Sequence, residues 1–251
     1  MPTPGILYAA GRITSPDLTP AAFTEWYNTV HIREVLSIPS GPPRAYRFEN
    51  TATTTDAPTH PPYLALYPVD DLSIVSSPHF AALSDTHPLL PHGASYLSLT
   101  AFDVRVYATV ETYTKDTAAS APTPTPTHAL TLALAPSSST SPTQLTAWTR
   151  AAHRALADRV PGYVRCTRYS LVAAPLANAR PRGEGEAVPS ELLVCEFAGE
   201  GVPSVQELEK IVRAAEGGEA VVGGAGILEQ DLWGLVFEGR KEDVDGEGGK
   251  A

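Results

Sequence analysis

The chain has 251 residues, of which 43% are hydrophobic, and its formal net charge at pH 7 is -10. This length and composition allow a sizeable core, while the acidic balance and the lack of any Lys/Arg cluster longer than a pair argue against nucleic acid and anionic membranes as partners. The two cysteines have no suitably spaced histidines, so no zinc site is predicted. The sequence contains no run of about 18 apolar residues that could form a membrane helix, and we expect a soluble, cytoplasmic protein.

The first half of the chain predicts the order strand, helix, strand, strand, helix, strand. Alternation and β-branched or aromatic content indicate strands at residues 6–13, 45–49, 63–69 and 96–111, the last one with a bend. Thr19 followed by Pro20 is typical of a helix start, and residues 77–83 predict a short second helix.

The second half repeats this order. Its strands are predicted at residues 129–135, 164–172, 192–197 and 232–237. A capping box at Ser141 predicts a helix that runs to about residue 158, and residues 205–215 predict an amphipathic helix. Two βαββαβ units predict an α+β fold of two ferredoxin-like repeats, whose antiparallel sheets cover each other and form a pseudo-dimeric α/β barrel.

A tryptophan followed five positions later by a histidine occurs twice, at Trp26/His31 and at Trp148/His153, and a basic-aromatic run follows each copy. Agreement at several points indicates one structural unit used twice. The predicted boundaries are an N-terminal repeat at 1–117, a Pro/Thr/Ala linker at 118–127, a C-terminal repeat at 128–240 and a disordered tail at 241–251. Because one chain supplies both sheets, we expect a monomer or a weak homodimer.

Three short motifs carry a resemblance to a known family: Gly5-Ile-Leu-Tyr, Trp26-Tyr-Asn-x-x-His31-Ile and Arg44-x-Tyr-Arg-Phe48. They resemble the dimeric α/β-barrel superfamily, in particular EthD-like proteins and their tandem two-copy fungal members. The resemblance covers about residues 5–112 and is weaker over 128–238. The superfamily includes cofactor-free decarboxylases, dehydratases, cyclases and isomerases, heme enzymes, quinone-forming monooxygenases and members without assigned activity, so fold analogy leaves the reaction open. EthD-like relatives often act on polyketide intermediates, which implies a small aromatic or polyketide-like ligand.

His31 is the main catalytic candidate. Phe23, Tyr27 and His31 are spaced four positions apart, so they form one helix ridge that should face the sheet. A partly desolvated imidazole stays neutral, and His31 could then act as a general acid/base on an aromatic or enolisable substrate. The alternative is a structural histidine that fills the space between helix and sheet. His153 lies on a more polar ridge and is expected to be structural.

Arg47 is the second candidate, because a buried arginine needs a carboxylate. The alternatives are an internal ion pair with Glu49 on the same strand face, a solvated surface position, or a substrate carboxylate held by Arg47, which would suit a decarboxylase. With Tyr27 holding a developing enolate or phenolate, the predicted catalytic residues are His31, Tyr27 and Arg47.

A pocket for a flat polyphenol would be lined by aromatic side chains, and Tyr8 and Tyr67 are expected to point inward on their strands. The predicted substrate-binding residues are Tyr8, Trp26, Asn28, Tyr46, Tyr67, His79, Tyr96 and Phe102. His79, His87 and His92 do not share a helix face, so no metal site is predicted, and one of these histidines is expected to approach the pocket rim as a second acid/base group.

The sequence thus favours a cofactor-free lyase or cyclase of secondary metabolism, which would decarboxylate, dehydrate or cyclise an aromatic or polyketide-like intermediate. Two alternatives stay open. One is a non-catalytic, small-molecule-binding or stress-associated barrel, and the other is a heme- or oxygen-using enzyme.

Overall fold

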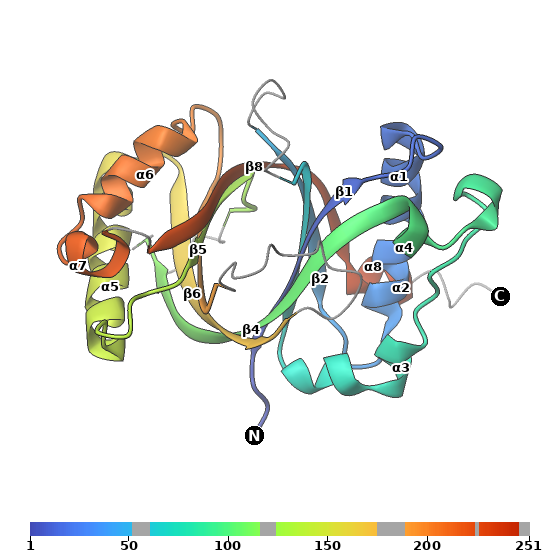
Figure 1. Ribbon diagram of the computed structural model, residues 1–251, viewed down its shortest axis with the longest axis horizontal. Coiled ribbons are helices and arrows are strands. Elements are labelled where there is room, and N and C mark those ends of the chain that lie inside the picture. The colour runs from blue at the N-terminus through green and yellow to red at the C-terminus, as the bar shows by residue number, and fades with distance from the viewer. Residues whose placement is uncertain (52–60, 116–123, 175–188, 224–225, 246–251) are drawn as a thin grey trace.

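The computed structural model describes residues 1–51, 61–115, 124–174, 189–223 and 226–245. Its strands close into one antiparallel barrel in the order β1-β3-β2-β8-β5-β7-β6-β4 (Figure 1). The strands are β1 (Gly5–Ile13), β2 (Arg44–Asn50), β3 (Tyr63–Val69), β4 (Thr100–Thr114), β5 (His128–Leu134), β6 (Tyr163–Ala173), β7 (Glu191–Phe197) and β8 (Ile227–Arg240).

The helices cover the outside of the barrel in two groups on opposite sides (Figure 1). The first-half helices are α1 (Pro20–Trp26), η1 (Tyr27–His31), α2 (Ile32–Ser37), η2 (Leu72–Ser76), α3 (Pro78–Ala81), η3 (Pro91–Gly93) and α4 (Tyr96–Leu99). The second half contributes α5 (Pro142–Arg159), α6 (Val205–Arg213) and α7 (Gly218–Val222), and α8 (Lys241–Asp245) follows β8. No helix within the described ranges is long and apolar enough to cross a membrane.

The two halves have the same topology, which confirms the predicted fold class. The first sheet has the order β4-β1-β3-β2 and the second has the order β8-β5-β7-β6, and β2–β8 and β4–β6 pairing joins them into the barrel. Each half packs an apolar cluster between its helices and its sheet, and a third cluster fills part of the lumen. Side chains on the sheet therefore belong either to a helix-covered layer or to the lumen.

The predicted helix starts are confirmed. Thr19 caps α1 by accepting a hydrogen bond from the Ala22 amide, with Pro20 in the first turn. At α5 the Ser141 hydroxyl accepts from the Gln144 amide and the Gln144 side chain accepts from the Ser141 amide, which completes the capping box.

Two strands begin several residues away from their predicted starts. The strand expected from residue 96 begins at Thr100, because Ser95 caps a helical turn, α4, by accepting from the Leu97 amide. Strand β8 begins at Ile227 rather than at residue 232, because its early acidic side chains have partners in the barrel. Arg105 donates to Glu229 at 2.7 Å, and Asn50 donates to Asp231 at 2.7 Å.

The predicted disordered tail is wrong for residues 241–245, which form α8 and pack against α2. The Lys241 ammonium donates to the Leu36 and Ile38 carbonyls at 2.6 and 3.0 Å, and so binds the C-terminal end of α2. Residues 246–251 and most of the predicted linker (116–123) lie outside the described residues.

Candidate functional site

The long helix over the first-half sheet contains a π-helical turn, η1, between α1 and α2. The Ile32 amide donates to the Tyr27 carbonyl five residues earlier, which widens the helix where Tyr27 and His31 are placed. Phe23, Tyr27 and Val35 are buried against the sheet as the ridge predicted, while the π-turn replaces the regular four-residue spacing between Tyr27 and His31. Single π-helical turns are frequent at functional sites, so η1 marks the region to examine.

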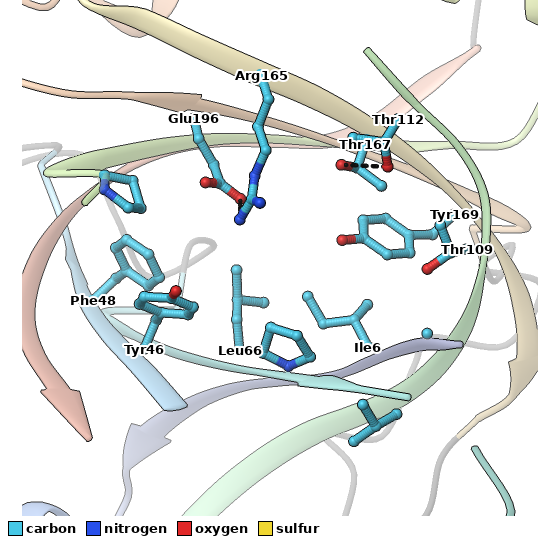
Figure 2. Close-up of a pocket in the computed structure, with 14 residues that line it drawn as sticks. Ile6, Tyr46, Phe48, Leu66, Thr109, Thr112, Arg165, Thr167, Tyr169 and Glu196 are labelled. Carbon is cyan, nitrogen blue, oxygen red and sulfur yellow. Dashed lines mark hydrogen bonds and ion pairs between the residues drawn. The ribbon is translucent and has the colours of Figure 1, made fainter. Parts of the chain in front are cut away.

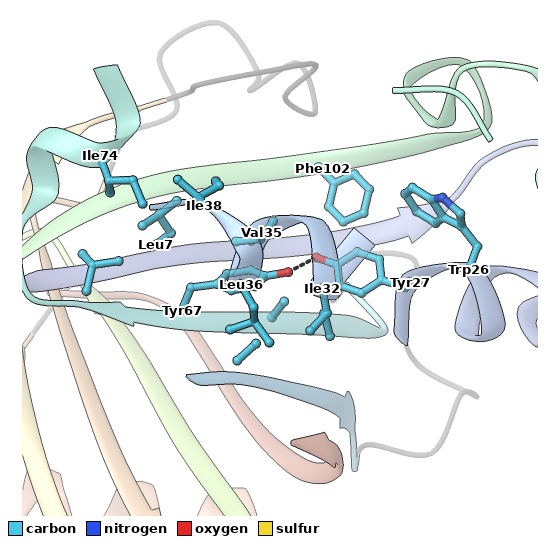
Figure 3. Packing of buried hydrophobic residues seen from close by; sticks show 14 of the residues in the cluster. Leu7, Trp26, Tyr27, Ile32, Val35, Leu36, Ile38, Tyr67, Ile74 and Phe102 are labelled. Atoms are coloured by element: carbon cyan, nitrogen blue, oxygen red, sulfur yellow. Dashed lines mark hydrogen bonds between the residues drawn. The ribbon is translucent and has the colours of Figure 1, made fainter. Parts of the chain in front are cut away.

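A pair of phenols lies beneath η1. The Tyr67 hydroxyl on β3 donates to the Tyr27 hydroxyl at 3.2 Å (Figure 3). Burial raises the pKa of Tyr27 to about 12 and raises the pKa of Tyr67 well above its usual value, so both phenols are protonated at neutral pH. Because the Tyr27 oxygen accepts from Tyr67, the proton of Tyr27 is available to an oxygen atom of a ligand.

His31 is half-buried among aromatic rings. Its ring centroid lies 5.3 Å from Trp26, 4.9 Å from Tyr27 and 5.7 Å from Tyr96. Its Nδ1 is buried and has no hydrogen-bond partner among the described residues. Desolvation lowers the pKa of His31 to about 4, so the imidazole is neutral at pH 7 and can accept a proton.

Arg47 points from β2 into the same helix-covered layer and is 1% exposed. Its Nη2 donates to the Thr24 hydroxyl at 3.1 Å, and its guanidinium carbon lies 5.8 Å from the Tyr27 ring centre and 5.2 Å from that of Tyr63. Glu49, the counter-ion considered from the sequence, is 3.7 Å away and 48% exposed. Within the described part of the chain, Nε and Nη1 of Arg47 are buried without a partner. Burial lowers the pKa of this guanidinium from its usual value, against the weaker effect of Glu49.

The structure thus brings most of the predicted site residues together around η1. Asn28 also belongs to η1, and its Oδ1 is buried and unpaired among the residues described. The ring contacts and hydrogen bonds join Trp26, Tyr27, His31, Arg47, Tyr67, Tyr96 and Phe102. Sequence reasoning missed Thr24 and Tyr63, which contact Arg47 directly.

Tyr8 and Tyr46 do not belong to this cluster. Tyr8 pairs with Leu66 across β1 and β3, which places it in the lumen, on the face opposite Tyr67. The expectation that Tyr8 and Tyr67 line one pocket is wrong, because successive residues of a strand face opposite sides of the sheet.

Tyr46 instead lines a cavity of about 170 Å³ in the lumen (Figure 2). Arg165 and Glu196 reach into the lumen from β6 and β7 and form an ion pair of 2.8 Å there. This cavity is separated from His31 by the sheet.

Two other histidines considered from the sequence lie away from η1. His79 is exposed on α3 and lines a separate surface hollow beside Glu34 and Ser37. His153, the counterpart of His31, has its Nδ1 2.8 Å from the Tyr163 hydroxyl and stacks on Tyr113. Across the described ranges, no three His, Cys, Asp or Glu side chains are arranged to hold a metal ion.

No protein-family model and no curated protein matches the chain. Among solved structures, a mutant chlorite dismutase from Candidatus Nitrospira defluvii has a TM-score of 0.53 at 9% identity and covers 98% of this chain and 95% of that one. The same enzyme in complex with imidazole has a TM-score of 0.51 at 9% identity, with the same coverage. An anthrone oxidase-like protein has a TM-score of 0.49 at 11% identity, over 94% of this chain and 93% of that one.

The fold and the chlorite dismutase structures define the class of this protein as an α+β barrel of two ferredoxin-like halves, the architecture of the dimeric α/β barrels. At these identities the likeness concerns the fold alone.

Proposed function

We propose that the protein is a cofactor-independent enzyme that catalyses proton transfer on an aromatic or polyketide-like ligand bound beside η1. The observation that carries this proposal is the neutral His31, whose buried Nδ1 is unpaired among the described residues, next to a protonated Tyr27. A base and a hydrogen-bond donor in one aromatic site are the groups that enolisation requires.

The reaction begins with proton abstraction, because the imidazole of His31 is neutral at pH 7 and one of its two ring nitrogens can accept a proton. The imidazole takes a proton from a carbon next to a carbonyl, the C–H electron pair becomes the enolate, and Tyr27 donates to the enolate oxygen. In a dehydration, the imidazolium then returns its proton to the leaving hydroxyl, and water departs as the double bond forms. This order favours dehydration or cyclisation over aromatic decarboxylation, in which a proton must first be delivered to the ring.

The surroundings of His31 suit a flat substrate. Trp26, Tyr96 and Phe102 supply apolar faces around η1, and their rings lie within 6 Å of a neighbouring ring of the cluster. Desolvation by such walls strengthens the hydrogen bond from Tyr27 to a developing oxyanion. The second half lacks this arrangement, since Thr149 stands at the place of Tyr27 and His153 is paired with Tyr163.

The test uses benzoylacetate, an aromatic β-keto acid with an acidic methylene group. We expect the wild-type protein to accelerate exchange of the methylene protons for deuterium in D₂O, followed by NMR. The His31→Asn variant should lose this acceleration, whereas His92→Asn, at an exposed position, should retain it.

Three outcomes separate the alternatives. Saturable binding of benzoylacetate without faster exchange would refute the enzymatic proposal and support a binding barrel. Release of acetophenone faster than in a solution without the protein would indicate decarboxylation instead. A Soret band in the absorption spectrum of the purified protein would support the heme-using alternative.

A further inference from the structure

The corresponding arginines of the two halves have different hydrogen-bond partners. Arg168 on β6 is the counterpart of Arg47, and it repeats the contact with the helix, since its Nη2 donates to the Thr146 hydroxyl at 3.2 Å where Arg47 donates to Thr24 at 3.1 Å. Arg168 also donates from Nε to Glu111 and from Nη1 to Glu191, both at 2.8 Å. The two nitrogens that these carboxylates bind on Arg168 are the two that have no partner on Arg47 among the residues described.

Strand register shows which residue of the first half stands at the position of Glu191. Glu191 opens β7 and pairs with Ser170, two residues after Arg168. In the first half Tyr63 opens β3 and pairs with Glu49, two residues after Arg47. Tyr63 therefore occupies the place of Glu191, and its ring lies against the guanidinium rather than pairing with its charge.

Strand register also shows which residue stands at the position of Glu111. Glu111 on β4 is the direct partner of Arg168, and Phe237 on β8 is the direct partner of Arg47. Both pairs stand beside a break in register at the same point of the ladder, which fixes the correspondence. Phe237 packs against the apolar cluster of the first half.

The pKa of the guanidinium is shifted in opposite directions in the two halves. Burial disfavours the charged form of both guanidinium groups, but for Arg168 the hydrogen bonds that it donates to Glu111 and Glu191 outweigh burial and raise the pKa. For Arg47 burial prevails and lowers the pKa. A buried guanidinium with two free nitrogens and only an exposed carboxylate nearby attracts an anion that can accept from both nitrogens.

We propose that Arg47 binds the carboxylate of the substrate, and that Tyr63 and Phe237 set this specificity by standing where the second half has glutamates. The proposal rests on the proposed function, because Tyr27 lies between Arg47 and His31 and makes ring contacts with both. The substrate class is thus an aromatic carboxylate with an acidic carbon next to a carbonyl. Binding requires the aromatic side chains around Arg47 to shift, since the two nitrogens that have no partner among the described residues are buried.

The test compares benzoylacetate with its methyl ester, which lacks the charge. Ligand-observed NMR titration of the wild-type protein should show the acid binding at least tenfold more tightly than the ester, the effect of a hydrogen bond to a charged group. Arg47→Met should remove this preference and leave ester binding unchanged. Arg44→Met, on the same strand but at an exposed position, should keep the preference.

A second variant tests the role of Tyr63 with the guanidinium intact. Tyr63→Glu installs the carboxylate of the second half, which should occupy Arg47 and lower the affinity for the acid at least tenfold. Tyr63→Gln, a neutral side chain of the same length, should keep the acid preference.

Equal binding of acid and ester by the wild type, or an acid preference that survives Tyr63→Glu, would overturn the inference. These equilibrium measurements do not depend on turnover. If the wild-type protein prefers the acid but does not accelerate exchange, only the proposed function is refuted. If it accelerates exchange but binds acid and ester equally well, only the role of Arg47 is refuted.

Discussion

The stability of two matched arginine variants tests whether the charge of Arg47 lacks a compensating carboxylate in the protein without ligand. Arg168→Met removes the ion-pair partner of Glu111 and Glu191, whose side chains are only 15% and 12% exposed. Breaking a buried ion pair from one side costs about 3–5 kcal/mol. We expect a loss in the free energy of unfolding of that size for Arg168→Met.

Arg47→Met should behave differently, because the lost contacts are weak. The variant gives up one hydrogen bond to Thr24, a screened pair with Glu49 worth about 0–1 kcal/mol, and ring contacts worth about 0.5–2 kcal/mol each. It also removes two buried nitrogens without partners among the described residues, whose burial costs about 1–3 kcal/mol each. The terms nearly cancel, so the free energy of unfolding should change by no more than about 1 kcal/mol.

Urea unfolding of both variants and of the exposed Arg44→Met control measures these changes. The reasoning predicts that the two buried variants differ by about 3 kcal/mol, with Arg47→Met close to the wild type. If Arg47→Met is destabilised as strongly as Arg168→Met, the guanidinium is already neutralised in the free protein, and the anion site is refuted.

Two further predictions concern His31 and helix α6. Because burial lowers the pKa of His31 from 6.5 to about 4, the unfolded chain binds a proton between these pH values and the folded protein does not, so stability falls as the pH falls through this window, by about 2 kcal/mol at about pH 5. Urea unfolding at about pH 7.5 and about pH 5 should show this component in the wild type, and His31→Asn should lack it; equal pH dependence in both contradicts the buried, neutral imidazole. Ser204→Ala breaks the capping box with Glu207 and should cost about 1 kcal/mol, measured by thermal unfolding, and an unchanged midpoint would mean that the first turn of α6 contributes nothing.

Much of the fold could be predicted because alternation, caps and the repeat agree with one another. The strand at residues 63–69 was predicted with its observed bounds, and the caps at Thr19 and Ser141 were predicted with their proline residues. The early part of β8 was missed because Glu229 and Asp231 interrupt the apolar pattern. Their partners, Arg105 and Asn50, come from β4 and β2, so only the closed barrel explains why these charges stand in a strand.

The site was harder to predict than the fold. The spacing of Phe23, Tyr27 and His31 indicates a ridge facing the sheet, but it does not reveal that the turn from Tyr27 to His31 is π-helical. Alternation places Tyr8 and Tyr67 on definite faces of their strands, but it does not say which face carries the helices. Pairing register supplies that information, and register depends on the neighbouring strand rather than on the strand itself.

The balance of charge on each arginine depends on both halves of the chain at once. Glu111 belongs to β4 of the first half but neutralises Arg168 of the second, and Phe237 belongs to β8 of the second half but faces Arg47 of the first. A glutamate-to-phenylalanine difference at the end of one repeat therefore changes the site in the other repeat. Each site is bordered by the last strand of the other half of the chain. A change in that strand can therefore leave one site with a complete ion network and the other with a guanidinium that lacks a buried carboxylate among the described residues, without any change in the arginine itself.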